Sequence, residues 1–181
     1  VQIGNEINSG LLFPMAPTSK GYGRIADYLS YGLKAVKDIS LDIKTIIHLA
    51  EGASEAALIN YFDRLIQNDL KFDVIGLSYY SFWHGSIEKF EATLKVLNDR
   101  YEQEIAVMEY SYGFTNKPVE HASHIFNSEL AEMGGYEATM QGQASYIRDV
   151  NNAIASIDKG IGSFYWEPAW LPIKNSGWAN A

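Results

Sequence analysis

The chain has no cysteine among its 181 residues, which excludes disulfides, thiol catalysis and thiolate metal sites. It also has no run of lysine or arginine, and its formal net charge is −8. Nucleic acids and anionic membrane surfaces are both bound through a basic face, so neither is an expected partner. No apolar run in the sequence approaches the roughly 20 residues that a membrane-spanning helix needs.

The composition is that of a globular protein, with 47% hydrophobic and 20% charged residues. The length is that of one ordinary domain, so we expect a single domain over residues 1–181. Aromatic residues make up 13% of the chain and include 12 tyrosines and 4 tryptophans. Such side chains stack on sugar rings and also fill ordinary cores, so composition leaves both interpretations open.

Short apolar runs alternate along the chain with stretches in which apolar residues recur every three or four positions. Runs typical of buried strands occupy residues 1–7, 42–50, 72–80, 105–111 and 160–166. Helical periodicity occupies residues 23–39, 54–68, 86–101 and 142–157. This alternation predicts a parallel sheet that is covered by helices.

The pattern favours one kind of α/β fold. No GxGxxG or Walker loop follows any predicted strand, so a nucleotide-binding doubly wound sheet has no support. A (β/α)8 barrel remains, but eight strands normally take about 250 residues. We therefore expect a partial barrel that contains strands 4 to 8 with their helices, cut just before its fourth strand.

Barrel enzymes place their chemistry at the carboxyl ends of the strands. The predicted strand ends carry Asn5, Glu6, His48, Tyr80, Trp83, His84, Glu109, Trp166 and Glu167. A buried carboxylate is costly unless it is paired or used in chemistry. Glu6 and Glu109 are therefore either salt-bridge partners at the barrel rim or catalytic acids, and the pattern leaves both open.

Alternation along residues 72–80 separates the aromatic side chains. Ser78 and Tyr80 share one face of this strand, while Leu77 and Tyr79 share the other. Small residues suit the barrel interior, so Tyr80 is the expected site residue and Tyr79 packs against the helices. His48 is either a site residue or a hydrogen-bonded structural histidine.

Four segments carry a resemblance to a known family. They are QIGNEI (2–7), DVIGLSYYSFWHG (73–85), GYEATMQGQASYIRDV (135–150) and GIGSFYWEPAW (160–170). In this order they resemble the C-terminal portion of glycoside hydrolase family 53, the endo-β-1,4-galactanases (arabinogalactan endo-1,4-β-galactosidases). The resemblance implies a retaining hydrolase that cleaves internal bonds of β-1,4-galactan, needs no cofactor, and is secreted or held at the cell surface or in the periplasm.

The resemblance also implies roles for individual residues. Glu6 matches the acid/base and Glu109 the nucleophile of the family. Asn5 can donate its amide to the sugar 2-hydroxyl, and Trp166 forms a flat floor for a galactose ring or, alternatively, seals the core. The other strand-end residues are expected to contact substrate; they are His48, Tyr80, Trp83, His84 and Glu167.

The sequence departs from the family pattern after the expected nucleophile. Residues 110–112 read Tyr-Ser-Tyr, so substrate contacts beyond the cleavage point differ. The long stretch 112–141 is the part in which some relatives bind calcium, but here it contains no aspartate. Its polar residues include Glu120, His121, His124, Asn127, Ser128 and Glu129. These do not form a dense oxygen cage, and His121-x-x-His124 lacks partner ligands, so we expect no metal.

Two other functions stay open. One is another retaining glycosidase of the same clan, of the β-mannanase or xylanase type. The other is a non-catalytic fragment that binds galactan. Because a cut barrel exposes strand edges at Val1 and at residues 160–166, we also expect the fragment to self-associate and to have little activity alone.

Overall fold

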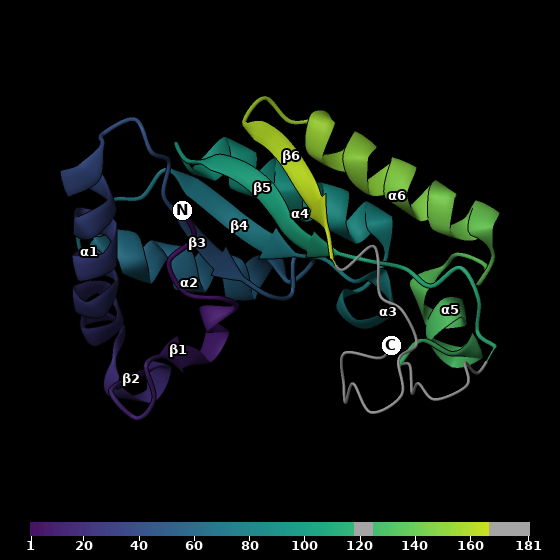
Figure 1. The fold of residues 1–181 in the computed structure, drawn as a ribbon, viewed down its shortest axis with the longest axis horizontal. Helices are drawn as coiled ribbons and strands as arrows, with labels where there is room; N and C mark the ends of the chain where they lie inside the picture. Colours follow the sequence, from purple (N-terminus) through teal and green to yellow (C-terminus); the bar gives the residue numbers. More distant parts are fainter. Residues whose placement is uncertain (118–124, 167–181) are drawn as a thin grey trace.

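The computed structural model describes residues 1–117 and 125–166. A parallel sheet runs through the middle of this part of the chain in the order β3-β4-β5-β6 (Figure 1). Its strands are β3 (Ile46–Leu49), β4 (Val74–Ser78), β5 (Glu104–Tyr110) and β6 (Gly160–Tyr165). Four parallel strands that alternate with helices confirm the predicted α/β class.

Four long helices follow the predicted periodicity closely. They are α1 (Tyr22–Ile39), α2 (Glu55–Gln67), α4 (Ile87–Arg100) and α6 (Met140–Ala155). Two of them begin at a side-chain cap, because Ser86 accepts a hydrogen bond from the Lys89 amide and Thr139 accepts one from the Gly142 amide. Figure 1 shows α4 behind the sheet and α6 alongside β6.

The core lies between the sheet and these helices. Leu77 of β4 and Tyr79 just beyond it are fully buried on the helix side. The Tyr79 ring stacks on Phe90 of α4 with a centroid distance of 4.0 Å, and its backbone carbonyl accepts a hydrogen bond from the Tyr146 hydroxyl of α6. Tyr79 therefore packs outside the sheet, as the alternation predicts.

The opening run forms less strand than its sequence predicts. Residues 1–3 pair in parallel with the edge of β3, where the Ile3 amide donates to the Ile46 carbonyl and the Ile46 amide donates to the Val1 carbonyl. Gly4 (φ 81°) and Glu6 (φ 45°) then leave the extended conformation. The prediction of a strand through residue 7 is too long, because hydrophobic alternation carries no signal for left-handed backbone.

Several short elements were not predicted. The segment before α1 contains η1 (Ile7–Ser9), η2 (Thr18–Lys20) and an antiparallel pair, β1 (Gly10–Leu11) with β2 (Ala16–Pro17). Helix α3 (Ser81–His84) follows β4, and α5 (Ser128–Gly134) lies within the stretch 112–141. Asn127 caps α5 by accepting from the Leu130 amide. Every helix in the described residues is too short or too polar to cross a bilayer.

The stacked pair of Tyr79 and Phe90 yields a stability prediction. Phe90 is fully buried, so Phe90→Ala removes the stack and leaves a cavity beneath the sheet. We expect the free energy of unfolding in urea to fall by about 3–5 kcal/mol. Tyr31 of α1 is 74% exposed, and Tyr31→Ala is the matched control with a change of about 0.5 kcal/mol or less. A loss below about 1 kcal/mol for Phe90→Ala would show that the stack is not part of the core.

Candidate active site

A β-bulge at the carboxyl end of the sheet sets the direction of Glu109. Leu77 of β4 is paired with Val107 of β5, but the next residue, Ser78, is paired with Glu109, so Met108 is skipped. Without this shift, alternation would send Glu109 to the helix side together with Val107. The bulge instead brings Glu109 to the face of the sheet that Ser78 occupies.

A second carboxylate reaches the same place from the N-terminal segment. Glu6 has left-handed backbone (φ 45°, ψ 53°), a conformation that costs a non-glycine residue about 1–2 kcal/mol. A hydrogen bond of 2.6 Å joins Glu6 Oε1 and Ser78 Oγ. One carboxylate oxygen of Glu6, one of Glu109 and one ring nitrogen of His48 lie within 4.8 Å of one another. The two predicted carboxylates therefore converge at one site.

Glu109 is almost completely buried and has an aromatic partner. Its exposed fraction is 8%, and the Tyr80 hydroxyl donates a hydrogen bond to Glu109 Oε2 at 3.1 Å. A phenol that donates to a carboxylate holds it in a fixed orientation and stabilises its ionised form. Tyr80 thus points to the site while Tyr79 points away from it.

Polar side chains join Glu6 to Asn5 through a buried histidine. His48 Nε2 is 2.8 Å from Ser78 Oγ, and His48 Nδ1 is 3.0 Å from Asn5 Oδ1. Burial lowers the pKa of His48 to about 4, against the opposing effect of the Glu6 charge. The imidazole is therefore neutral at pH 7 and fully hydrogen-bonded. Sequence reasoning placed Ser78 on the inner face but did not name it as a site residue.

Glu6, His48 and Glu109 could each offer one ligand atom to a metal ion. Both ring nitrogens of His48 already have hydrogen-bond partners, so coordination would break one of these bonds. Histidine ligands normally keep the second nitrogen bonded to a carboxylate, a carbonyl or water while the first holds the metal. The arrangement fits a carboxylate pair better than a metal centre.

The structure describes only some of the residues that were considered as calcium ligands. Glu120, His121 and His124 lie outside the described residues. Asn127 caps α5, and the Ser128 hydroxyl accepts a hydrogen bond from Asn116 at 2.7 Å. The Asn127 contact caps the start of α5, and the Ser128 contact joins that start to the segment that follows β5.

Exposed aromatic rings lie next to Tyr80. Trp83 of α3 is 52% exposed and its ring centroid is 5.5 Å from that of Tyr80. His84 Nδ1 accepts a hydrogen bond from the Tyr80 amide, and burial lowers the pKa of His84 while the charges of Glu51 and Glu6 oppose this. An exposed indole beside a buried tyrosine is a surface on which a sugar ring can stack.

The end of β6 contributes a second tryptophan. Trp166 is 42% exposed, and its amide donates a hydrogen bond to the Tyr110 carbonyl. Glu167 lies outside the described residues.

Sequence reasoning also missed Glu51, which follows β3 with left-handed backbone (φ 64°) and whose charge acts on the pKa of His84. Its position directly beyond a strand end was a signal that could have found it.

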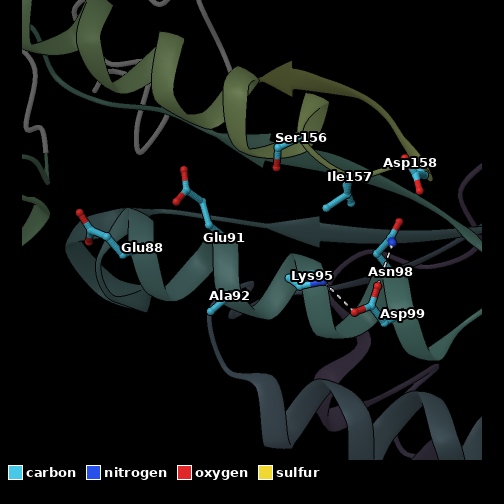
Figure 2. A pocket seen from close by; sticks show the side chains of 9 residues that line it. All are labelled: Glu88, Glu91, Ala92, Lys95, Asn98, Asp99, Ser156, Ile157 and Asp158. Carbon is cyan, nitrogen blue, oxygen red and sulfur yellow. Dashed lines mark hydrogen bonds and ion pairs between the residues drawn. The ribbon is translucent and has the colours of Figure 1, made fainter.

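A hollow elsewhere on the molecule does not include these residues. A groove of about 520 Å³ lies between α4 and the segment that leads from α6 into β6 (Figure 2). Its lining includes Glu88, Glu91 and Asp158, and Lys95 is ion-paired with Asp99 inside it. The groove is on the helix layer, whereas the carboxylate pair is at the strand ends.

The lowered pKa of His48 predicts how stability depends on pH. An unfolded histidine titrates near 6.5, so between pH 6.5 and about 4 the unfolded chain binds a proton that the folded chain does not. The contribution of the neutral His48 to the free energy of unfolding is therefore lost as the pH falls from 6.5 to about 4. We expect wild type to lose up to about 2 kcal/mol more than His48→Gln between pH 7 and pH 5, measured by guanidinium unfolding. Equal losses in the two proteins would contradict a neutral His48.

Comparisons with known proteins identify the family of this chain. Residues 1–181 match the family described as Glycosyl hydrolase family 53. The chain is 30% identical to an endo-beta-1,4-galactanase of Bacillus subtilis (strain 168), over 96% of this chain and 39% of that protein. It is 34% identical to an arabinogalactan endo-beta-1,4-galactanase of Humicola insolens, over 98% of this chain and 54% of that protein.

Solved structures extend the likeness to the fold. The GH53 catalytic domain of Ignisphaera aggregans is 40% identical with a TM-score of 0.92, and the match covers 98% of this chain and 49% of that one. The chain thus spans 39% to 54% of the length of these three relatives, and its sheet and helices form part of a (β/α)8 barrel. It belongs to glycosyl hydrolase family 53.

Proposed function

We propose that this chain carries the catalytic carboxylates of a retaining hydrolase that cleaves internal β-1,4-galactosidic bonds in galactan and arabinogalactan. The observation that supports this most directly is the approach of Glu6 and Glu109, whose carboxylate oxygens lie within 4.8 Å of one another. Retaining glycosidases hold their two carboxyl groups about 5–5.5 Å apart, whereas inverting enzymes leave about 6.5–9.5 Å for a water molecule. The close approach favours retention.

The surroundings of the two acids support different roles. Glu109, buried and oriented by Tyr80, is the proposed nucleophile; it attacks the anomeric carbon and forms a glycosyl ester. Glu6 is the proposed acid/base, and it gives its proton to the departing glycosidic oxygen in the first step. In the second step Glu6 takes a proton from water, the resulting hydroxide breaks the ester, and both residues return to their starting states.

Nearby side chains are proposed to bind the sugar. Asn5 is exposed at the site, where its amide can donate to the 2-hydroxyl of the sugar being cleaved. Trp83 and Trp166 offer exposed indole faces for galactose rings.

The choice of galactan as substrate rests on the names of the relatives, and turnover of a panel of β-1,4-linked galactan, mannan and xylan distinguishes it from the mannanase and xylanase alternatives. A polysaccharide does not cross a membrane intact, so we expect the protein to act outside the cytoplasm.

Paired variants of the acids test the assignment in the natural protein that carries this sequence. Glu109→Ala removes the nucleophile and should abolish turnover of galactan and of aryl β-galactosides alike. Glu6→Ala should reduce galactan cleavage by about 10²–10⁴-fold but spare the first-turnover release of a good aryl leaving group, which needs little protonation. Glu102→Ala, an exposed glutamate before β5, is the control. Equal losses of Glu6→Ala on both substrates would contradict the division of roles, and galactan binding without turnover by wild type would support the non-catalytic alternative.

The open edges of the sheet support a proposal about association. In the described residues, β6 pairs with β5 alone, and β3 has a further partner only in residues 1–3. Ile161 and Phe164 of β6 are 48% and 58% exposed, and unpaired strand edges with apolar side chains favour contact with another chain. We propose that the 181-residue chain self-associates through these edges.

Light scattering of the purified 181-residue chain measures this association. We expect a dimer or larger species with little galactanase activity, and Phe164→Asp should weaken the association because it places a charge on the β6 edge. Phe114→Asp, which is equally exposed at 55% but lies beyond β5, is the matched control and should leave it unchanged. A stable monomer with full endo-activity would overturn the proposal.

A further inference from the structure

The side chains around Glu6 form a chain of hydrogen bonds whose proton positions can be worked out from one fixed end. The Gln2 amide nitrogen donates to the Gly4 carbonyl at 2.9 Å and to Asn5 Oδ1 at 3.0 Å. A backbone carbonyl can only accept, so the Gln2 atom at this point is the NH₂ group. The Asn5 atom that faces it is therefore the oxygen, because two NH₂ groups would repel each other.

The orientation of Asn5 determines the tautomer of His48. Since Asn5 Oδ1 is an acceptor, the facing His48 Nδ1 must carry a hydrogen. Burial lowers the pKa of His48 to about 4, so the ring is neutral at pH 7 and has only this one hydrogen. His48 Nε2 is then an acceptor, and its 2.8 Å contact with Ser78 requires the Ser78 hydroxyl to donate to it.

The hydrogen bond that Ser78 donates to His48 in turn determines whether Glu6 carries a proton. Ser78 Oγ is 2.6 Å from Glu6 Oε1, a contact in which the hydroxyl would donate to an ionised Glu6. The Asn5 and His48 constraints instead use the single hydroxyl hydrogen of Ser78 on His48, and in that order Ser78 Oγ presents only lone pairs to Glu6. Two lone pairs at that distance repel, whereas a protonated carboxyl group makes a strong hydrogen bond. The other complete pairing has an ionised Glu6 and a doubly protonated His48, and burial of His48 opposes it.

We propose that Ser78 and His48 are positioning residues that keep the proton on Glu6 at the start of each catalytic cycle and keep the Asn5 NH₂ group turned toward the substrate. The proposal rests on the role of Glu6 as acid/base in the proposed function. In the resting order, Glu6 donates to Ser78, Ser78 donates to His48 Nε2, and His48 Nδ1–H donates to Asn5.

The catalytic cycle changes this order and then restores it. When Glu6 gives its proton to the leaving oxygen, the Ser78 hydroxyl can turn to donate to the new carboxylate, which leaves His48 Nε2 without a donor. The pairing becomes complete again when Glu6 takes a proton from the attacking water. The state in which His48 Nε2 lacks a donor therefore favours return of the proton to Glu6, which is what hydrolysis of the glycosyl ester requires.

Other ionisable groups face this hydrogen-bonded chain. Glu109 at the end of β5 lies against Glu6 and His48, with Tyr80 bonded to it. His84 of α3 is close enough to Glu6 and to Glu51, beyond β3, for a negative charge on either carboxyl group to act on its pKa. Because these groups also affect a pH profile, the test includes a readout that reports on His48 alone.

That readout is the tautomer of His48, observed by long-range proton–nitrogen NMR correlation on the 181-residue chain at pH 7. We expect a protonated Nδ1 and an unprotonated Nε2, with the signals assigned by their loss in His48→Gln. An Nε2–H tautomer or a doubly protonated ring would overturn the proposal. The result does not depend on activity, so it is distinguishable from failure of the proposed function, which the Glu6 and Glu109 variants report.

The pH profile of kcat/KM for galactan in the natural protein gives the second test. Ser78 either accepts a proton from Glu6 or donates one to it, and in Ser78→Ala these two roles shift the alkaline limb of the profile in opposite directions. Under the proposal, Ser78→Ala removes the acceptor of the Glu6 proton, and the alkaline limb of the profile moves by at least about half a pH unit to lower pH. A serine that simply donates to an ionised Glu6 would, when removed, move that limb to higher pH. An upward shift or no shift overturns the proposal.

Two further variants serve as controls for this profile. Ser78→Thr keeps a hydroxyl at the same position and should retain the wild-type limb. Ser163→Ala removes a strand hydroxyl of β6 that bonds Asn151 and lies outside the chain of hydrogen bonds, so its profile should also be unchanged. Were Ser78→Ala unable to fold, the tautomer measurement on the unmodified chain would still decide the matter.

Discussion

The pairing of β4 with β5, interrupted by one skipped residue, is the constraint on which the candidate site depends. The shift sets Ser78 opposite Glu109 and turns Glu109 away from the helix layer that Val107 faces. A bulge costs a regular ladder position, and such irregularities concentrate where a side chain must be re-aimed. Here the re-aimed side chain is a carboxylate, and the same shift leaves Ser78 free to contact Glu6 from the neighbouring segment.

A central strand with a bulge and a left-handed turn at the sheet edge therefore bring Glu109 and Glu6 together. Glu109 is held by a strand in the middle of the sheet, buried and bonded to Tyr80. Glu6 is held at the edge of the sheet by a left-handed turn that its contact with Ser78 helps to maintain. Backbone strain of this kind persists only where surrounding contacts compensate for it, and it is common at functional sites. This arrangement supports the proposed roles of Glu109 as nucleophile and Glu6 as acid/base.

Sequence periodicity accounts for most of the fold. Apolar spacing indicated α1, α2, α4 and α6, and continuous apolar runs indicated the strands, because burial of a helix face or of both sheet faces must appear in the residue pattern. It missed α5, whose start depends on a single capping contact of Asn127, and it extended the first strand beyond Ile3. Local hydrogen bonds and left-handed residues leave little trace in hydrophobic patterning.

For the site, the sequence by itself determined which residues stand at strand ends and, through strict alternation, that Tyr80 faces inward and Tyr79 outward. It did not determine that Glu109 shares the face of Ser78, since alternation alone would have placed it among the helices. Nor did it determine the contacts that join Asn5, His48, Ser78 and Glu6. Those depend on the register between strands and on a turn at Glu6, which are properties of segments brought together only when the chain is folded.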